Sequence, residues 1–167
     1  MQKRYLIIPL ITITVAVLGS LLTSAGMPWY NAELIKPALT PPSWVFPLAW
    51  NTIFVLATAS ALITYDKAND EINFFFFKFH KEPKPVHIIA LTFFAANAVL
   101  NVFWSFLFFY LQDPQAAFIE MLVLELTLIA LHFFTWKISR IASLLLLPYT
   151  IWVAFASYLT YLILQLN

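Results

Sequence analysis

Five long apolar runs, separated by shorter polar segments, dominate the pattern of this chain. A helix needs about 20 predominantly apolar residues to cross a bilayer, and each run reaches that length. We expect membrane-spanning helices at about residues 5–24, 44–65, 86–111, 116–136 and 141–164. Because two of the connecting segments are too short to hold a domain, residues 1–167 are predicted to form a single all-α domain. The fold class is therefore an integral membrane bundle of five antiparallel helices.

The composition supports a membrane protein. Hydrophobic residues make up 62% of the chain and charged residues 10%, whereas soluble domains are about 25% charged. A soluble fold of this size leaves too much surface exposed to hide so many apolar side chains. The chain has no cysteine, which excludes disulfides and thiolate metal sites. We find no internal repeat, so the sequence does not support an inverted-repeat transporter.

The basic residues are divided unequally between the two sides of the predicted bundle. One side carries Lys3, Arg4, Lys67, Lys78, Lys81, Lys84, Lys137 and Arg140, and the other carries only Lys36. The positive-inside rule then places the N-terminus on the cytoplasmic side and the C-terminus opposite. A cleaved signal peptide is the alternative for the first run. That run continues past Val15 and is too long for a typical signal sequence, which favours a retained helix.

The connection at residues 66–85 contains the phenylalanine-rich segment Asn73–His80. Its phenylalanines and lysines favour a segment at the membrane interface, where rings enter the headgroup region and lysines meet anionic lipid. A docking site for a partner protein is the alternative.

Polar and tryptophan side chains gather in one half of the predicted bundle. We measure depth from the side of the loop at residues 27–42, with a rise of about 1.5 Å per helical residue. On that scale Asn101 and Trp50 lie roughly 8–10 Å inside, Asn97 and Glu125 roughly 13–14 Å, and Trp152 roughly 17–18 Å. Polar residues are costly in hydrocarbon and usually face the bundle interior or a cavity. The clustering predicts a pocket that opens toward this loop.

Two predicted helices each place three of these side chains on one face. The faces comprise Asn97, Asn101 and Trp104 in one helix and Tyr149, Trp152 and Ala156 in the other. Interhelical hydrogen bonding is an equal alternative for the asparagines, and core packing is the alternative for the tryptophans. Trp50 and Trp152 are too deep for the interfacial aromatic belt, which accounts better for Trp29, Trp44 and Trp136.

The ionisable residues within the spans form no recognisable catalytic arrangement. Glu120 and Glu125 lie about 140° apart around their helix, so they do not make a carboxylate pair. Glu120 is expected to pair across helices or to meet solvent, and the deeper Glu125 is the better candidate for a ligand pocket. His80, His87 and His132 are scattered. With no metal-ligand spacing, nucleophile arrangement, phosphate loop or nucleic-acid stripe, we expect no metal, no cofactor and no nucleic-acid partner.

The segment between the first two runs has the properties of a lid. Pro37, Pro41 and Pro42 each fix φ, which stiffens a loop that also contains several aromatic residues. A stiff aromatic loop over the mouth of a pocket is typical of a lid, and we assign this role to residues 27–42.

Three motifs resemble the translocator protein family, also called the TspO/MBR family. They are Trp29-Tyr30 with Lys36-Pro37, Pro41-Pro42-Ser43-Trp44-Val45-Phe46 and Trp50; Asn97 with Asn101, Trp104 and Phe108-Phe109; and Leu146-Leu147-Pro148-Tyr149 with Trp152, Phe155 and Ala156. The motifs occur in the family's order over residues 29–167. The chain departs from the family by one extra residue in the lid, by Asn97 in place of Gln, and by Thr160 in place of Asn. Tyr161 is followed by no cation, so the cholesterol motif of animal members is incomplete.

The resemblance implies a five-helix bundle that binds porphyrins and other bulky hydrophobic ligands beneath the first loop. It further implies a homodimer in the lipid membrane, with a role in tetrapyrrole regulation or stress. The expected ligand-binding residues are Tyr30, Trp50, Asn97, Asn101, Trp104, Glu125, Tyr149, Trp152 and Ala156. Our interpretation is a receptor or sensor. The alternatives are light-dependent porphyrin degradation, in which Trp50 and Trp152 would be catalytic, and transport of porphyrin or lipid.

The unequal distribution of basic residues predicts the topology of the chain in the membrane. Reporter fusions at the two ends are expected to place the N-terminus in the cytoplasm and the C-terminus on the opposite side. If both ends report the same side, the number of spans is wrong; if both are exchanged, the orientation is wrong.

Overall fold

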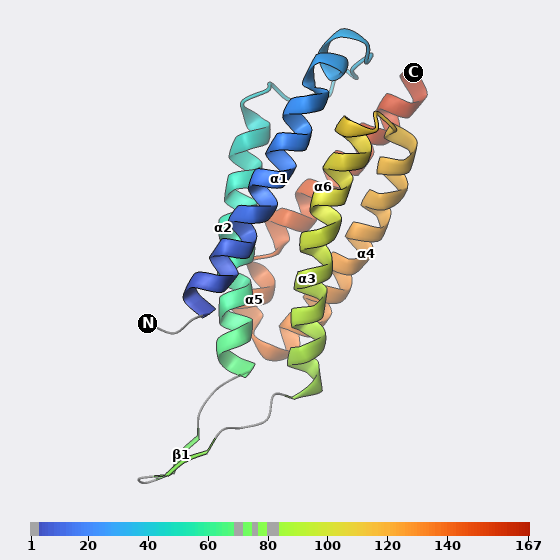
Figure 1. The fold of residues 1–167 in the computed structure, drawn as a ribbon. Coiled ribbons are helices and arrows are strands. Elements are labelled where there is room, and N and C mark those ends of the chain that lie inside the picture. The colour runs from blue at the N-terminus through green and yellow to red at the C-terminus, as the bar shows by residue number, and fades with distance from the viewer. Residues whose placement is uncertain (1–3, 69–71, 75–76, 80–83) are drawn as a thin grey trace.

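The computed structural model describes residues 4–68, 72–74, 77–79 and 84–167. Within these ranges, five segments are helical, long and apolar enough to cross a membrane, which confirms the predicted fold class. The helices in chain order are α1 (Arg4–Ala32), α2 (Val45–Ala68), α3 (Pro85–Ser105), the π-helix η1 (Phe106–Tyr110), α4 (Pro114–Ile138), α5 (Arg140–Leu144) and α6 (Leu147–Leu166). They form one elongated bundle, and the segment between α1 and α2 lies at the same end as the C-terminus (Figure 1).

Two short strands lie in the connection between α2 and α3. β1 (Ile72–Phe74) and β2 (Phe77–Phe79) pair antiparallel, with Asn73 opposite Lys78. They project from the end of the bundle opposite the C-terminus (Figure 1). The side chains of the segment Asn73–His80 lie outside the described residues, so its position at the membrane interface stays a prediction.

Helix α4 is the central helix of the bundle because it packs against both α3 and α6. Its buried residues are Ala117, Glu120, Met121, Leu124, Leu128, Leu131 and Thr135. Apart from Glu120, they recur at alternating intervals of four and three residues, which is the spacing of a single inward-facing helical stripe. Large apolar side chains on the opposite face, among them Leu126 and Ile129, are exposed, as expected of a surface that faces lipid.

Helix α1 is longer than the sequence predicts. The run was expected to end near Ser24, but the helix continues through Pro28 to Ala32, so the non-helical segment covers residues 33–44 instead of 27–42. The last two turns are held by ring contacts: Trp29 lies 5.9 Å from Phe108 between ring centroids. Packing of this kind compensates for the one backbone hydrogen bond that a proline removes. Trp29 is therefore also part of the core rather than only of an interfacial belt.

The last predicted helix is divided into α5 and α6 by a turn at residues 145–146. Pro148 lies in the first turn of α6, and it lacks the N–H group that would continue the hydrogen-bond ladder from α5. The backbone instead makes shorter-range bonds, from Leu146 N to Ser143 O and from Tyr149 N to Leu146 O, both at 3.0 Å.

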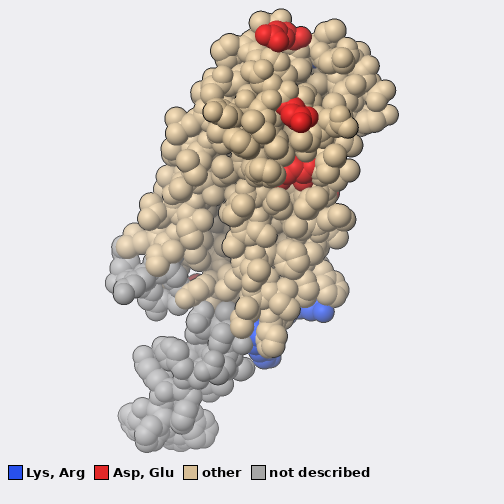
Figure 2. All heavy atoms as spheres, turned by 45° about the vertical axis from the view of Figure 1, so that its right-hand side comes forward, with Lys and Arg blue, Asp and Glu red and all other residues tan. Residues whose placement is uncertain are grey.

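The charged side chains separate along the bundle. Lys67, Lys84, Lys137 and Arg140 lie at helix ends on the side of the α2–α3 connection, and Lys36 lies at the other end. On the face shown in Figure 2, Lys and Arg atoms appear at the lower end and most acidic atoms in the upper half. We call the end that carries these four cations the basic end. Which compartment it faces stays a prediction.

Helix α1 approaches the backbone of η1 closely at Gly26. A Cβ atom placed on Gly26 would clash with the backbone of Phe109, at 2.7 Å from its Cα. Small residues allow membrane helices to approach in this way. Only glycine at position 26 permits the packing of α1 against η1 that places Trp29 and Tyr30 beside Phe108.

Gly26→Ala is expected to lower the thermal stability of the protein, because α1 must move away from Phe109 to admit a methyl group. Overpacking typically costs about 1–3 kcal/mol. Because the clash is with the backbone of Phe109 and not with a flexible side chain, we expect a cost that exceeds the gain of about 1 kcal/mol that alanine brings to a helix interior. Thermal unfolding in a mild detergent measures the change.

Gly19→Ala is the matched control on the same helix. Its methyl group would lie 3.5 Å from the Ser105 hydroxyl, an ordinary van der Waals distance. The control is expected to leave the melting temperature unchanged or to raise it. Equal melting temperatures for the two variants would contradict the close approach at Gly26.

Candidate functional site

The Trp50 side chain lies at the junction of α2, α3 and α6. Its indole stacks on Phe54 with centroids 5.7 Å apart, and it lies 6.4 Å from the Trp104 ring and 6.2 Å from the Tyr149 ring. Trp50 is half-buried and packs against the main hydrophobic core. Three of the predicted ligand-binding residues, one from each of three helices, therefore meet directly.

The two asparagines predicted on one face of α3 both make hydrogen bonds to other helices. Asn101 donates from Nδ2 to the Tyr149 hydroxyl of α6 at 3.1 Å, and Asn97 donates from Nδ2 to Thr127 Oγ1 of α4 at 2.8 Å. Both asparagines are buried. The interhelical role that was left open is thus present, and it fixes the Tyr149 ring beside Trp50.

A continuous layer of aromatic rings leads from Trp50 toward the segment at residues 33–44. Trp104 stacks on Phe108 at 5.5 Å, and Tyr30 lies 6.2 Å from the same Phe108 ring. The Lys36 ammonium group lies 4.5 Å above the Tyr30 ring. Tyr30 is therefore separated from Trp50 by two intervening rings and forms the outer layer of the site.

Trp152 lies on the side of α6 that faces the start of α2. Its ring is 5.8 Å from Phe46 in an edge contact and 5.7 Å from Phe155. It packs against the same core cluster as Trp50. Ala156 is half-buried one turn further along α6. The two deep tryptophans thus reach one core from different helices.

The acidic residues of α4 lie on two sides of its buried stripe. Glu120 stands two turns before Thr127, whose hydroxyl meets Asn97 of α3, so Glu120 is on the α3 side. Glu125 stands two turns before His132, whose Nε2 lies 2.8 Å from Thr150 of α6, so Glu125 is on the α6 side.

Glu120 lies in a different environment from the one that the sequence predicts. It was expected to pair across helices or to meet solvent, but it is 5% exposed and neither carboxylate oxygen has a hydrogen-bond partner in the described part of the chain. The pairing of Asn97 with Thr127 on antiparallel helices puts Trp104 level with Glu120, seven residues along each helix. The Trp104 indole N–H is also buried without a partner.

Most of the buried polar atoms without a partner lie in this half of the bundle. Besides Glu120 and Trp104 they belong to Asn97, Glu125 and Ser157, whereas Thr64 and His87 carry such atoms near the basic end. An unpaired buried polar atom costs about 1–3 kcal/mol. Their concentration beside the aromatic layer distinguishes this region from an optimised core and makes it the candidate binding site.

The segment at residues 33–44 is attached to the end of α6. The Asn167 side chain accepts from Ile35 N at 2.9 Å and donates to Ile35 O at 3.1 Å. Lys36 Nζ donates to Asn31 Oδ1 at 3.2 Å, and Pro37 is buried. These contacts attach the segment to the ends of α1 and α6, and its role as a lid stays a prediction.

Only some signals in the sequence identify these residues. Helical spacing finds Asn97, Asn101 and Trp104, but it gives no reason to select Phe46 or Phe54 among the many phenylalanines. No group of three or more His, Asp or Glu side chains suited to a metal ion occurs among the described residues.

Comparison with known proteins identifies the family to which this chain is similar. A model of the TspO/MBR family matches residues 7–166. The tryptophan-rich protein TspO of Chlorobaculum tepidum is 35% identical over all of this chain and 99% of its own length. The translocator protein of Ovis aries is 30% identical over 85% of this chain and 76% of its own length. The tryptophan-rich sensory protein of Cereibacter sphaeroides is 28% identical over 83% and 77%, respectively.

Tyr149→Phe is expected to destabilise the protein, because it removes the acceptor of the Asn101 amide. Interhelical hydrogen bonds in membrane proteins contribute about 0.6 kcal/mol on average and up to about 1.7 kcal/mol. A double-mutant cycle of Tyr149→Phe with Asn101→Leu, measured by unfolding in detergent, is expected to show a coupling energy of this size. The same cycle with Asn97→Leu is the control and should be additive. Additivity in both cycles would contradict the hydrogen bond.

Proposed function

The chain belongs to the TspO/MBR family of membrane proteins, and from this premise we propose that it binds porphyrins in the half of the bundle beneath residues 33–44. In this role the protein acts as a membrane receptor or sensor for tetrapyrroles. The observation that carries the proposal is the layer of rings from Trp50 through Trp104 to Phe108, bordered by buried polar atoms that have no partner.

The chemistry of a porphyrin matches this arrangement. A flat aromatic macrocycle gains both buried area and ring contacts against indole faces. Its polar groups supply partners for atoms such as the Trp104 N–H and the Glu120 oxygens. Lys36, beside Tyr30 at the outer layer, is suited to a carboxylate on the macrocycle edge.

Entry of a large ligand requires the lid to separate from the bundle. The rings of Trp50, Trp104 and Tyr149 pack against one another, so a macrocycle must displace some of these contacts. We infer that residues 33–44 open by release of Ile35 from Asn167, which involves two exposed hydrogen bonds. Breaking two exposed bonds costs little compared with opening the core.

Two alternatives share this site. In the first, the protein degrades porphyrin under light, with Trp50 and Trp152 as the reacting side chains; their packing against one core cluster favours contact with a single ligand. In the second, it transports porphyrin or lipid, a role that the name of the Ovis aries translocator protein suggests. The name of the Cereibacter sphaeroides sensory protein favours the receptor. In each case we propose a homodimer in the lipid membrane.

Substitution of the two deep tryptophans tests the site. Trp50→Phe and Trp152→Phe keep an aromatic ring but remove the indole. If both residues contact one porphyrin, each variant is expected to bind protoporphyrin more weakly by about 2- to 12-fold, which corresponds to about 0.5–1.5 kcal/mol per aromatic contact. Spectroscopic titration of the purified protein in darkness measures the affinity.

Trp136→Phe is the matched control, because Trp136 is 48% exposed and lies at the basic end, outside both the ring layer and the lid. It should leave the affinity unchanged. Repeating the titration under illumination separates the alternatives: a degrading enzyme consumes the porphyrin, and the deep variants lose this consumption while they retain binding. Unchanged affinity and unchanged photochemistry in folded Trp50→Phe and Trp152→Phe variants would contradict the proposal that both residues contact one porphyrin.

A further inference from the structure

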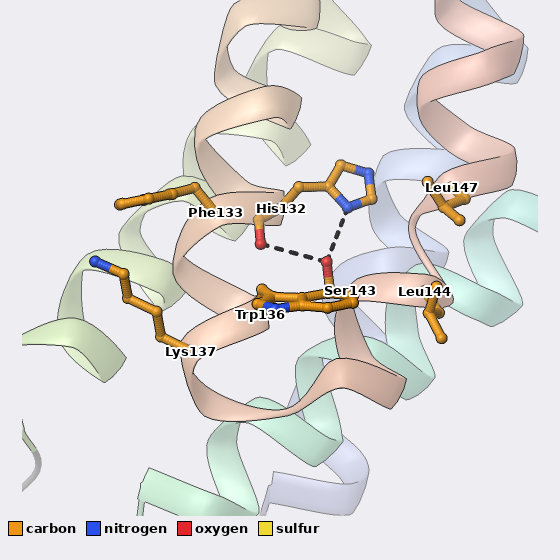
Figure 3. Close-up of a pocket in the computed structure, with 7 residues that line it drawn as sticks. All are labelled: His132, Phe133, Trp136, Lys137, Ser143, Leu144 and Leu147. Carbon is orange, nitrogen blue, oxygen red and sulfur yellow. Dashed lines mark hydrogen bonds between the residues drawn. The ribbon is translucent and has the colours of Figure 1, made fainter.

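A groove opens on the bundle at the basic end, away from the layer of aromatic rings that contains Trp50 and Trp104. It has a volume of about 430 Å³ and is lined by His132, Phe133, Trp136, Lys137, Ser143, Leu144 and Leu147. Figure 3 shows it between the last turns of α4 on one side and α5 with the start of α6 on the other. Its volume lies within the range of about 300–1,000 Å³ that is typical of small-molecule sites. None of its residues belongs to the site proposed for porphyrin.

The lining of the groove offers apolar surface. The Trp136 indole and the side chains of Leu144 and Leu147 line the groove, and Figure 3 shows how these side chains lie. Leu144 is 51% exposed and Leu147 is 43% exposed, so both remain available for contact. A groove with such walls accommodates a hydrocarbon chain.

The polar groups within the groove already bond to one another. His132 Nδ1 lies 3.0 Å from Ser143 Oγ, and His132 Nε2 lies 2.8 Å from Thr150 Oγ1. The Ser143 hydroxyl is also 3.3 Å from the backbone oxygen of His132. Because both ring nitrogens are engaged, this cluster closes the turn between α4 and α6. Its partners are satisfied within the chain, which argues against a nucleophilic serine here.

Two cations form the rim that we consider here: Lys137 lines the groove, and Arg140 lies against the ring of Trp136, which also lines it. The Lys137 ammonium group lies 3.9 Å from the Phe133 ring centroid, and the Arg140 guanidinium group lies 5.6 Å from the Trp136 ring. Both side chains are exposed, and within the described ranges neither makes an ion pair with a carboxylate. The rings hold both positive charges next to the apolar groove while leaving them free to meet an anion.

We propose that this groove binds one anionic phospholipid. An acyl chain lies against Trp136, Leu144 and Leu147, and the phosphate group lies between Lys137 and Arg140. The charge of the rim selects an anionic headgroup, and the apolar lining selects a molecule with a hydrocarbon chain. Basic residues at the ends of membrane helices attract anionic headgroups in this way, and the groove gives that attraction a fixed position.

The test uses the full chain in a mild detergent and native mass spectrometry. Phosphatidylglycerol and phosphatidylcholine with identical acyl chains are titrated into the protein. One phosphatidylglycerol is expected to remain bound per chain, with an affinity on the order of 30-fold above that of phosphatidylcholine, as two basic residues near a headgroup provide. Equal affinity for the two lipids would overturn the proposal.

Paired substitutions locate the site. Lys137→Gln with Arg140→Gln is expected to abolish the preference for phosphatidylglycerol. Lys67→Gln with Lys84→Gln removes the same charge from exposed positions at the same end and should retain the preference. An equal loss in both double variants would show a diffuse attraction to the basic end and would overturn the specific site. Circular dichroism checks that each variant keeps its helical content.

A second pair tests the groove itself. Leu144→Trp fills the space and is expected to weaken phosphatidylglycerol binding at least tenfold, whereas Leu126→Trp adds the same bulk to the outward face of α4, where Leu126 is 66% exposed, and should have no effect. Inorganic phosphate at millimolar concentration is not expected to displace the lipid. Displacement by phosphate, or binding that survives Leu144→Trp, would overturn the role of the acyl chain.

Discussion

The structure depends on the cost of leaving a polar group unpaired in hydrocarbon. Backbone groups meet this constraint by forming helices. Many polar side chains meet it by hydrogen bonds to backbone oxygens of their own helix or of a neighbouring helix. Thr135, for example, donates to Leu131 O at 2.7 Å, and Ser60 donates across the bundle to Ala142 O at 2.7 Å. The second bond ties α2 to α5 near the basic end. Where such bonds are made the bundle is closed, and the region where they are missing is the site that we propose for the ligand.

The π-helix η1 shows how a local change in winding organises one end of the molecule. Leu107, Phe108 and Phe109 are consecutive and all buried, although an α-helix rotates each residue by about 100° and would turn one of them outward. The wider turn of η1 brings all three inward, and Gly26 allows α1 to meet them. The chain then reverses at Gln112, whose φ is 56°, and Asp113 caps α4 by accepting from Ala116 N at 2.9 Å.

The sequence predicts the parts of this fold that depend on length and spacing. Apolar runs give the five spans, and depth selects Trp50 and Trp152 as residues of the core rather than the interface. The extension of α1 through Pro28 does not follow from the sequence, because it depends on a tertiary contact with η1. Proline normally ends a helix, and only the packing of Trp29 and Tyr30 reverses that expectation. The winding of η1 is missed for the same reason, since hydrophobic spacing assumes a uniform helix.

Glu120 shows why the site is harder to predict than the fold. A carboxylate within a membrane span is normally expected to have a partner, because an unpaired carboxylate is costly in hydrocarbon. Here the carboxylate is buried, level with an indole N–H that is also unpaired, and both lie next to the ring layer. Natural sequences violate local rules mainly where function requires it, so the exception is itself informative. By contrast, both ring nitrogens of His132 have hydrogen-bond partners within the chain. The groove beside it offers a ligand only apolar walls and the two cations at its rim. In our two proposals the same helix therefore carries two kinds of site: α4 presents unpaired polar atoms to a polar, aromatic ligand in one half, and a satisfied, apolar surface to lipid in the other.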